Sequence, residues 1–143
     1  MKIRVPGDPV GKGRPRFSRS GFARTPEKTR KWEARAAYIA RAAWSGPMLE
    51  GAICATIEVV HKRPKRLHRR KDPAERLPNH TAQTDLDNCI KAALDALQGI
   101  CFRNDNQVFQ IVARQWYAGK EEEPCVEVTL ETFQERYDPE GTI

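Results

Sequence analysis

The residues whose types and spacing suggest chemistry are acidic and lie between positions 84 and 106. Asp85 and Asp87 are two residues apart where a loop is expected to enter a helix, so their carboxylates can converge before helical geometry separates them. Asp105 comes one helix and a return loop later, just before an expected strand, and can return beside the start of that helix. Three convergent carboxylates make an oxygen site suited to Mg²⁺ or Mn²⁺. The pattern therefore indicates a divalent metal site.

Lys91 is a fourth candidate, because it lies four residues after Asp87 on the same helix face and can reach a phosphate or a carboxylate. Each residue also has a purely structural interpretation. Acidic residues are favoured at helix starts as caps and by the helix dipole, and an Asp-Asn pair such as Asp105-Asn106 is common in turns. By itself, Lys91 has two structural interpretations, a solvated side chain or a pair with Asp87 or Asp95, and we interpret Asp95 as structural or supporting. Spacing alone therefore does not decide between a metal site and these structural roles.

The charge of the chain is divided between two halves. The 143 residues have a net charge of +6. Residues 1–84 hold 20 Lys and Arg against 7 Asp and Glu, whereas residues 85–143 hold 5 against 12. A basic half joined to an acidic half indicates a polyanion partner, most simply nucleic acid, with carboxylates gathered elsewhere. The alternative is a solvated basic face without a partner.

Several classes of protein are excluded by composition. No apolar run approaches the roughly 18 residues of a membrane span, and residues 1–6 contain no apolar signal segment. The four cysteines form no C-x-x-C pair and no zinc pattern with the histidines, so we expect structural, reduced thiols and a cytoplasmic protein.

The hydrophobic patterns predict a single α+β domain over residues 1–133, with a mixed β-sheet packed on two helices in the order β-α-β-α-β-β. The first helix should begin with Thr25 as N-cap and Pro26 in its first turn, and the second with Thr84 as cap; Gly99 should end the second. The expected strands are 2–5, 52–61 and a final hairpin of 107–117 with 126–131. Basic loops are expected at 10–24 and 61–83, the second one mobile, and a frayed polar tail at 134–143.

The run from Asp85 to Leu97, Asp-Leu-Asp-Asn-x-x-Lys-Ala-Ala-Leu-Asp-Ala-Leu, followed by Asp-x-Gln-Val at 105–108, closely resembles the RusA family of Holliday junction resolvases. The segments Gly-Lys-Gly-Arg-Pro-Arg-Phe at 11–17 and Thr-Pro-x-Lys-Thr-Arg at 25–30 are also similar to that family. The resemblance covers roughly residues 2–130. The family often has two aspartates before its last strands, where this chain has Asn104-Asp105.

The resemblance implies a small homodimeric endonuclease, usually encoded by a phage or prophage, that acts in DNA recombination and repair. Such enzymes bind four-way DNA junctions by shape and make paired nicks with Mg²⁺ or Mn²⁺, leaving 5′-phosphate ends. Matched position by position, Asp85, Asp87 and Asp105 correspond to the metal ligands and Lys91 to the active-site lysine.

Both lines of reasoning lead to one expected mechanism, in which the carboxylates hold a metal at the phosphate and Lys91 stabilises the charge of the transition state. The expected phosphate contacts are basic residues of the two loops: Lys12, Arg14, Arg16, Arg19, Lys62, Arg63, Lys65, Arg66, Arg69 and Arg70. Phe17 is expected either to stack on an opened base or to pack on the first helix. Two other functions stay open, namely a non-catalytic branched-DNA-binding module whose carboxylates are helix caps, and a flap or branch nuclease of broader specificity.

Overall fold

The computed structural model describes residues 1–13, 16–17, 19, 21 and 23–142. Its elements, in chain order, are β1 (Lys2–Pro6), β2 (Arg16–Phe17), β3 (Ala23–Arg24), α1 (Glu27–Ala43), β4 (Ile53–His61), the 3₁₀ helix η1 (Lys65–Leu67), β5 (Leu77–Pro78), α2 (Leu86–Leu97), the 3₁₀ helix η2 (Asp105–Gln107), β6 (Val108–Tyr117), β7 (Cys125–Thr132) and α3 (Phe133–Tyr137). The predicted α+β class with a mixed sheet is confirmed. The sequence patterns missed the short strands β2, β3 and β5 and the helix α3.

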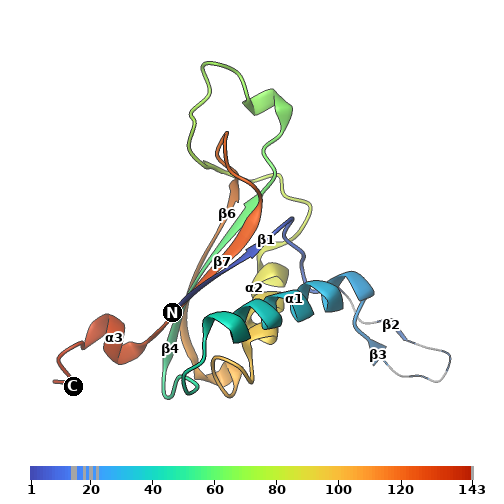
Figure 1. Ribbon diagram of the computed structural model, residues 1–143. Coiled ribbons are helices and arrows are strands. Elements are labelled where there is room, and N and C mark those ends of the chain that lie inside the picture. Colours follow the sequence, from blue (N-terminus) through green and yellow to red (C-terminus); the bar gives the residue numbers. More distant parts are fainter. Residues whose placement is uncertain (14–15, 18, 20, 22, 143) are drawn as a thin grey trace.

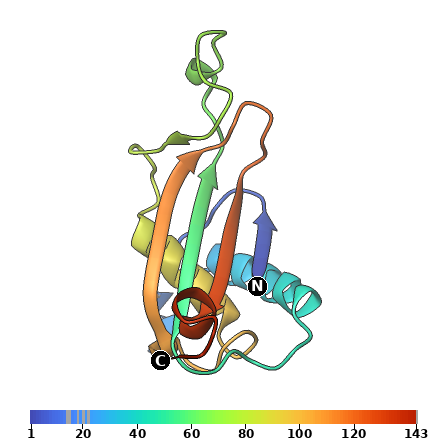
Figure 2. The same ribbon diagram turned by 90° about the vertical axis from the view of Figure 1, so that its left-hand side faces the viewer.

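The main sheet has five strands in the order β1-β7-β4-β6-β5. Its central strand, β4, is antiparallel to β7 and parallel to β6. A parallel pair requires a long crossover, and α2 lies in the connection between β4 and β6. Helices α1 and α2 lie together on one face of the sheet, while α3 projects from the other side (Figure 1). Figure 2 shows the long strands side by side with α1 and α2 behind them.

The predicted hairpin of the last two long strands is wrong. Strands β6 and β7 follow one another in the chain, but β4 lies between them and pairs with both. Alternating polar and apolar residues reveal which face of a strand is buried but not which strand lies beside it. Consequently β6 is nearly an edge strand, since β5 pairs only with its last two residues, Trp116 and Tyr117.

The hydrophobic core lies between the sheet and the two long helices. Ile57 of β4 and Val128 of β7 are register partners and are buried, at 0% and 1% exposure. Trp32 and Ala36 of α1 and Leu97 of α2 cover them and their neighbours. The core fixes α2 against the sheet, and α2 carries most of the candidate site.

The helix ends differ from the predictions in informative ways. Helix α1 begins at Glu27 with Pro26 as its N-cap, one residue later than expected, and the N-cap of α2 is Asp85 rather than Thr84. The predicted stop at Gly99 is confirmed, because its φ of +85° is the left-handed conformation that ends helices. The expected frayed tail instead begins with α3, and a capping box closes its first turn.

All four cysteines are buried and free, in agreement with the structural role expected for them. Within the part of the chain that the structure describes, no helix has the length and apolar character needed to cross a membrane.

Candidate active site

Asp85 and Asp87 lie at the start of α2, and both are exposed. Asp85 is the N-cap in extended conformation, but its side chain makes no capping hydrogen bond. Burial raises the pKa of the Cys89 thiol to about 11, and the nearby charges of Asp85 and Asp87 add to this effect. Both carboxylates are therefore near the Cys89 side chain at the start of α2.

The capping interpretation of these carboxylates loses its main support. The predicted box with Thr84 as cap and Asp87 as its acidic member is absent, and among the described residues no hydrogen bond or ion pair is made by the carboxylate of Asp85 or Asp87. The helix dipole still favours acidic residues here. Both side chains nevertheless stay available for a ligand.

Lys91 lies one turn further along α2 and is exposed. The expected alternative, a pair with Asp87 or Asp95, is not seen in the described part of the chain. Asp95 instead forms an ion pair with Lys12, at 3.0 Å between Nζ and Oδ2. The ammonium group of Lys91 therefore stays uncommitted within the part of the chain that the structure describes.

Asp105 is the first residue of η2, and its position is set by neighbouring amides. Its backbone N–H donates to Oε1 of Gln98, just beyond the end of α2, at 3.1 Å. Asn104 and Gln107 form a capping box around η2. The Asp105 side chain is exposed beside the entry to β6.

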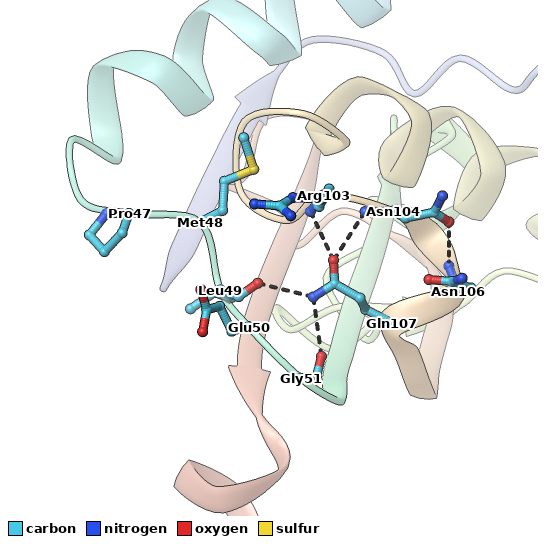
Figure 3. Close-up of a pocket in the computed structure, with 9 residues that line it drawn as sticks. All are labelled: Pro47, Met48, Leu49, Glu50, Gly51, Arg103, Asn104, Asn106 and Gln107. Atoms are coloured by element: carbon cyan, nitrogen blue, oxygen red, sulfur yellow. Dashed lines mark hydrogen bonds between the residues drawn. The ribbon is translucent and has the colours of Figure 1, made fainter.

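The side chain of Gln107 makes four hydrogen bonds that join two segments of this region (Figure 3). Its amide nitrogen donates to the carbonyl oxygens of Leu49 and Gly51, at 3.0 and 3.2 Å. Its amide oxygen accepts from the backbone N–H groups of Arg103 and Asn104, at 2.9 and 3.0 Å. The loop holding Asp105 is thereby tied to the segment before β4, and the two border a hollow of about 480 Å³.

Sequence reasoning assigned no role to Gln98 or Gln107. A signal for Gln107 exists in the sequence, since Asn104 followed three residues later by Gln is the spacing of a capping box. No local pattern announces Gln98, whose partner lies seven residues away across a turn.

The three predicted metal ligands are not brought together within one chain. Asp85 and Asp87 lie at the beginning of α2, whereas Asp105 contacts Gln98 at its end. A helix of 12 residues is about 18 Å long. Accordingly, no group of three or more His, Cys, Asp or Glu side chains that could hold a metal ion occurs among the described residues.

The donor set fits a hard cation only in part. Asp85 and Asp87 supply uncommitted carboxylate oxygens of the kind that Mg²⁺ prefers. If all three carboxylates are to bind one ion, Asp105 must come from a second copy of the chain.

The glycine-rich segment at 11–13 lies against the start of α2. The Lys12 N–H donates to the carbonyl oxygen of Asn88 at 2.9 Å, and buried Thr29 hydrogen-bonds to both Gly11 and Gly13. A Cβ at Gly11 would clash with Cγ2 of Thr84, so a larger residue would force this segment and the start of α2 to shift. This segment and Asp85 border a second hollow, of about 430 Å³.

Two of the predicted phosphate contacts are internal. Lys12 is bound to Glu33 and Asp95; partial burial lowers its pKa, but the hydrogen bonds to both carboxylates outweigh burial and raise it. Arg63 is only 4% exposed and hydrogen-bonds to backbone carbonyls. A phosphate contact by either side chain does not fit these positions.

The other predicted contacts are more accessible. The exposed cations are Arg19, Lys62, Lys65, Arg66, Arg69 and Arg70. Arg69 is also paired with Asp72, and Arg66 hydrogen-bonds to Tyr117. Arg14 lies outside the described residues, as do the side chains of Arg16 and Phe17.

An α+β domain that carries uncommitted carboxylates at a helix start and a set of exposed cations elsewhere has attributes found in nucleases. The chain matches the family described as "Endodeoxyribonuclease RusA" over residues 6–131. It therefore belongs to the RusA endodeoxyribonuclease family, whose members are Holliday junction-resolving endonucleases. It is also 31% identical over 137 residues to the uncharacterised protein YqaN of Bacillus subtilis (strain 168), covering 91% of this chain and 94% of that protein.

Proposed function

We propose that this protein is a Mg²⁺-dependent endodeoxyribonuclease that resolves four-way DNA junctions by paired nicks and works as a homodimer, with Mn²⁺ able to replace Mg²⁺. The observation that carries the proposal is the pair of exposed, uncapped carboxylates of Asp85 and Asp87, in a chain of this nuclease family.

The position of Asp105 supports a metal site shared between two chains. Asp105 lies at the beginning of β6, while Thr81, four residues before Asp85, hydrogen-bonds to Tyr117 at the end of β6. If two copies meet along β6 with the strands antiparallel, the beginning of one strand lies beside the end of the other. Asp105 of one copy then approaches Asp85 and Asp87 of the second copy.

The outer side of β6 suits such a contact. Over residues 108–115 it has no strand neighbour beyond β4 in the described part of the chain. Phe109 and Ile111 are exposed by 61% and 43%, unusual values for large apolar side chains in a strand. A second copy would cover both the open backbone groups and these side chains.

The chemistry assigns a role to each residue. A bound Mg²⁺ would polarise the scissile phosphate and lower the pKa of the attacking water. Asp85 and Asp87 from one chain, with Asp105 from the other, would hold the ion. Lys91 would stabilise the negative charge that builds up on the phosphate as the water attacks. Cleavage of the bond between phosphorus and the 3′-oxygen leaves 5′-phosphate and 3′-hydroxyl ends.

The decisive test is Asp85→Asn, with Glu121→Gln as a control that removes one exposed negative charge elsewhere. We expect Asp85→Asn to abolish Mg²⁺-dependent nicking of a synthetic four-way junction while junction binding is retained, and Glu121→Gln to behave as wild type. Unchanged nicking by Asp85→Asn would refute the site. If the wild type binds junctions but nicks none with either metal, the protein is a non-catalytic binding module.

A substrate panel separates a resolvase from a nuclease of broader specificity. Four-way, three-way, flap and linear duplex DNA are compared at equal concentration, and the products are mapped at nucleotide resolution. We expect paired, symmetric nicks on the four-way junction above all others. Equal cleavage of flap or linear DNA would contradict the assignment as a resolvase.

A further inference from the structure

The segment between β4 and β5, residues 62–76, projects from the end of the sheet as an arm (Figures 1 and 2). It leaves after His61 and returns at Leu77, and these two residues are register partners of Tyr117 on its two sides. Its exposed cations are Lys62, Lys65, Arg66, Arg69, Arg70 and Lys71. The basic loop expected from sequence at 61–83 thus contains, over residues 62–76, a segment closed by internal contacts.

Arg63 forms the centre of the arm. Its Nε donates to the carbonyl oxygen of Leu67 at 2.7 Å, and its Nη2 to that of Pro73 at 2.7 Å. Its Nη1 donates to Glu75 O at 2.9 Å and to Ala118 O at 3.4 Å. One guanidinium thus joins the outgoing part of the arm, the returning part and the turn after β6. At 4% exposure it forms no ion pair with any described residue, so carbonyl dipoles alone stabilise its charge.

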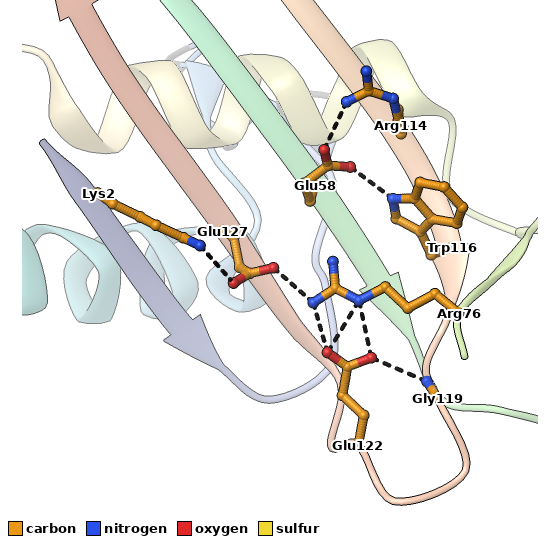
Figure 4. Close-up of polar contacts among 8 residues, drawn as sticks. All are labelled: Lys2, Glu58, Arg76, Arg114, Trp116, Gly119, Glu122 and Glu127. Carbon is orange, nitrogen blue, oxygen red and sulfur yellow. Dashed lines mark hydrogen bonds and ion pairs between the residues drawn. The ribbon is translucent and has the colours of Figure 1, made fainter. Parts of the chain in front are cut away.

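The turn after β6 holds the rest of the arm. Lys120 donates from Nζ to Arg69 O at 2.7 Å and from its backbone N–H to Ala74 O at 2.9 Å. Arg76 hydrogen-bonds to Glu122 and Glu127 where the arm rejoins the sheet (Figure 4). The exposed cations are therefore presented by a backbone that is fastened at several points.

We propose that Arg63 is a positioning residue for DNA binding: its buried guanidinium holds the arm in one shape, so that the exposed cations meet successive phosphates without prior ordering. The proposal rests on the proposed function, because it takes DNA as the partner. A loop without such a centre would lose conformational entropy on binding, and a preformed arm avoids that loss. Lysine cannot replace Arg63, since its single nitrogen cannot reach carbonyls on three sides as a planar fork does.

The experiment compares Arg63→Lys, which keeps the charge, with Arg70→Ala, which removes one exposed cation and leaves the fastening intact. Amide hydrogen exchange of residues 64–76 is measured first, in the protein without DNA. We expect exchange to rise by at least about tenfold in Arg63→Lys, as local opening becomes easier, and to stay at the wild-type rate in Arg70→Ala. Wild-type exchange in Arg63→Lys would overturn the proposal.

Junction binding is then measured as a function of salt. Loss of one phosphate contact lowers the slope of log K against log salt by about 0.9. We expect Arg70→Ala to lose about one contact by this measure. We expect Arg63→Lys to keep a slope near that of the wild type but to bind the junction at least about tenfold more weakly at every salt concentration, because ordering the arm on binding now costs conformational entropy. Wild-type affinity in Arg63→Lys would equally overturn the proposal.

A second variant keeps the test decisive if Arg63→Lys does not fold. A Cβ at Gly119 would lie 2.9 Å from Ala74 O, so Gly119→Ala pushes the arm away from the turn while Arg63 is retained. We expect the same faster exchange and weaker junction binding, and wild-type values of both would refute the proposed dependence. If the wild type binds no branched DNA, the proposed function fails while the exchange data still report on the arm.

Discussion

A shared metal site makes a strong prediction about mixtures of two inactive variants. Asp85→Asn and Asp105→Asn should each abolish nicking, because every site in either homodimer lacks a carboxylate. In a mixed dimer the two changes fall in the same site, and the other site combines Asp85 of one chain with Asp105 of the other. Mixing the variants should therefore restore nicking.

The expected size of the rescue follows from the geometry. Oxygens bound to one Mg²⁺ at 2.0–2.1 Å lie no more than about 4.2 Å apart, whereas α2 separates the two ends of the site by about 18 Å. Random exchange makes half of the dimers mixed, and each has one of its two sites intact, so nicking should recover to about a quarter of the wild-type rate. These dimers should make single rather than paired nicks.

The assay is initial-rate nicking of a labelled four-way junction after the two variants are refolded together, with differently tagged chains to count mixed dimers. A mixture of Asp85→Asn with Asp87→Asn is the matched control, since each of its sites lacks one ligand. A first mixture as inactive as its components, despite mixed dimers being present, would refute the shared site.

Three further predictions concern the surroundings of the site. Gln107→Ala removes four partly exposed hydrogen bonds and should lower the free energy of unfolding by about 2 kcal/mol and raise the Mg²⁺ concentration needed for nicking; wild-type urea unfolding would contradict this. Gly11→Ala places a Cβ against the residue before Asp85 and should cost about 1–3 kcal/mol in urea unfolding, whereas Gly46→Ala, with no contact below 3.4 Å, should stay within about 0.5 kcal/mol. The hydrogen bond from Arg76 holds the pKa of Glu122 below its ordinary value of 4.5, so its stabilising effect is complete above that pH and disappears as the pH falls through the lower, folded-state pKa. Urea unfolding from pH 7 to 3 should therefore show a smaller acid loss in Glu122→Gln than in wild type, and equal losses would count against the pair.

The sequence was sufficient to locate the candidate carboxylates and the buried faces of the strands. Asp85, Asp87 and Lys91 share one helical segment, so local spacing describes their arrangement well. Asp105 was expected beside the start of the helix, but the structure places it at the other end. The chain turns only after α2 has ended, so Asp105 stays beside the end of the helix. The spacing of residues along the sequence does not show how far the chain travels back after such a turn.

The roles of the basic residues were harder to predict because charge does not reveal burial. Lys12 and Arg63 have the same sequence context as the exposed cations near them, yet one is held by two carboxylates and the other by carbonyl oxygens. The two partners of Lys12 lie on different helices, and those of Arg63 meet only because the arm closes on itself and on the turn after β6. The order of the strands was missed for the same reason.

The arm joins the sheet at a single place, outside the helix that carries Asp85 and Asp87. The arm begins and ends beside Tyr117, so a longer, shorter or differently charged segment can occupy the same gap without disturbing the sheet or α2. If the arm binds DNA as proposed, changes there would alter how tightly a junction is held, while the backbone of Asp85 and Asp87 would be unaffected. The proposed binding segment and the candidate site are thus built from parts of the fold that can be changed separately.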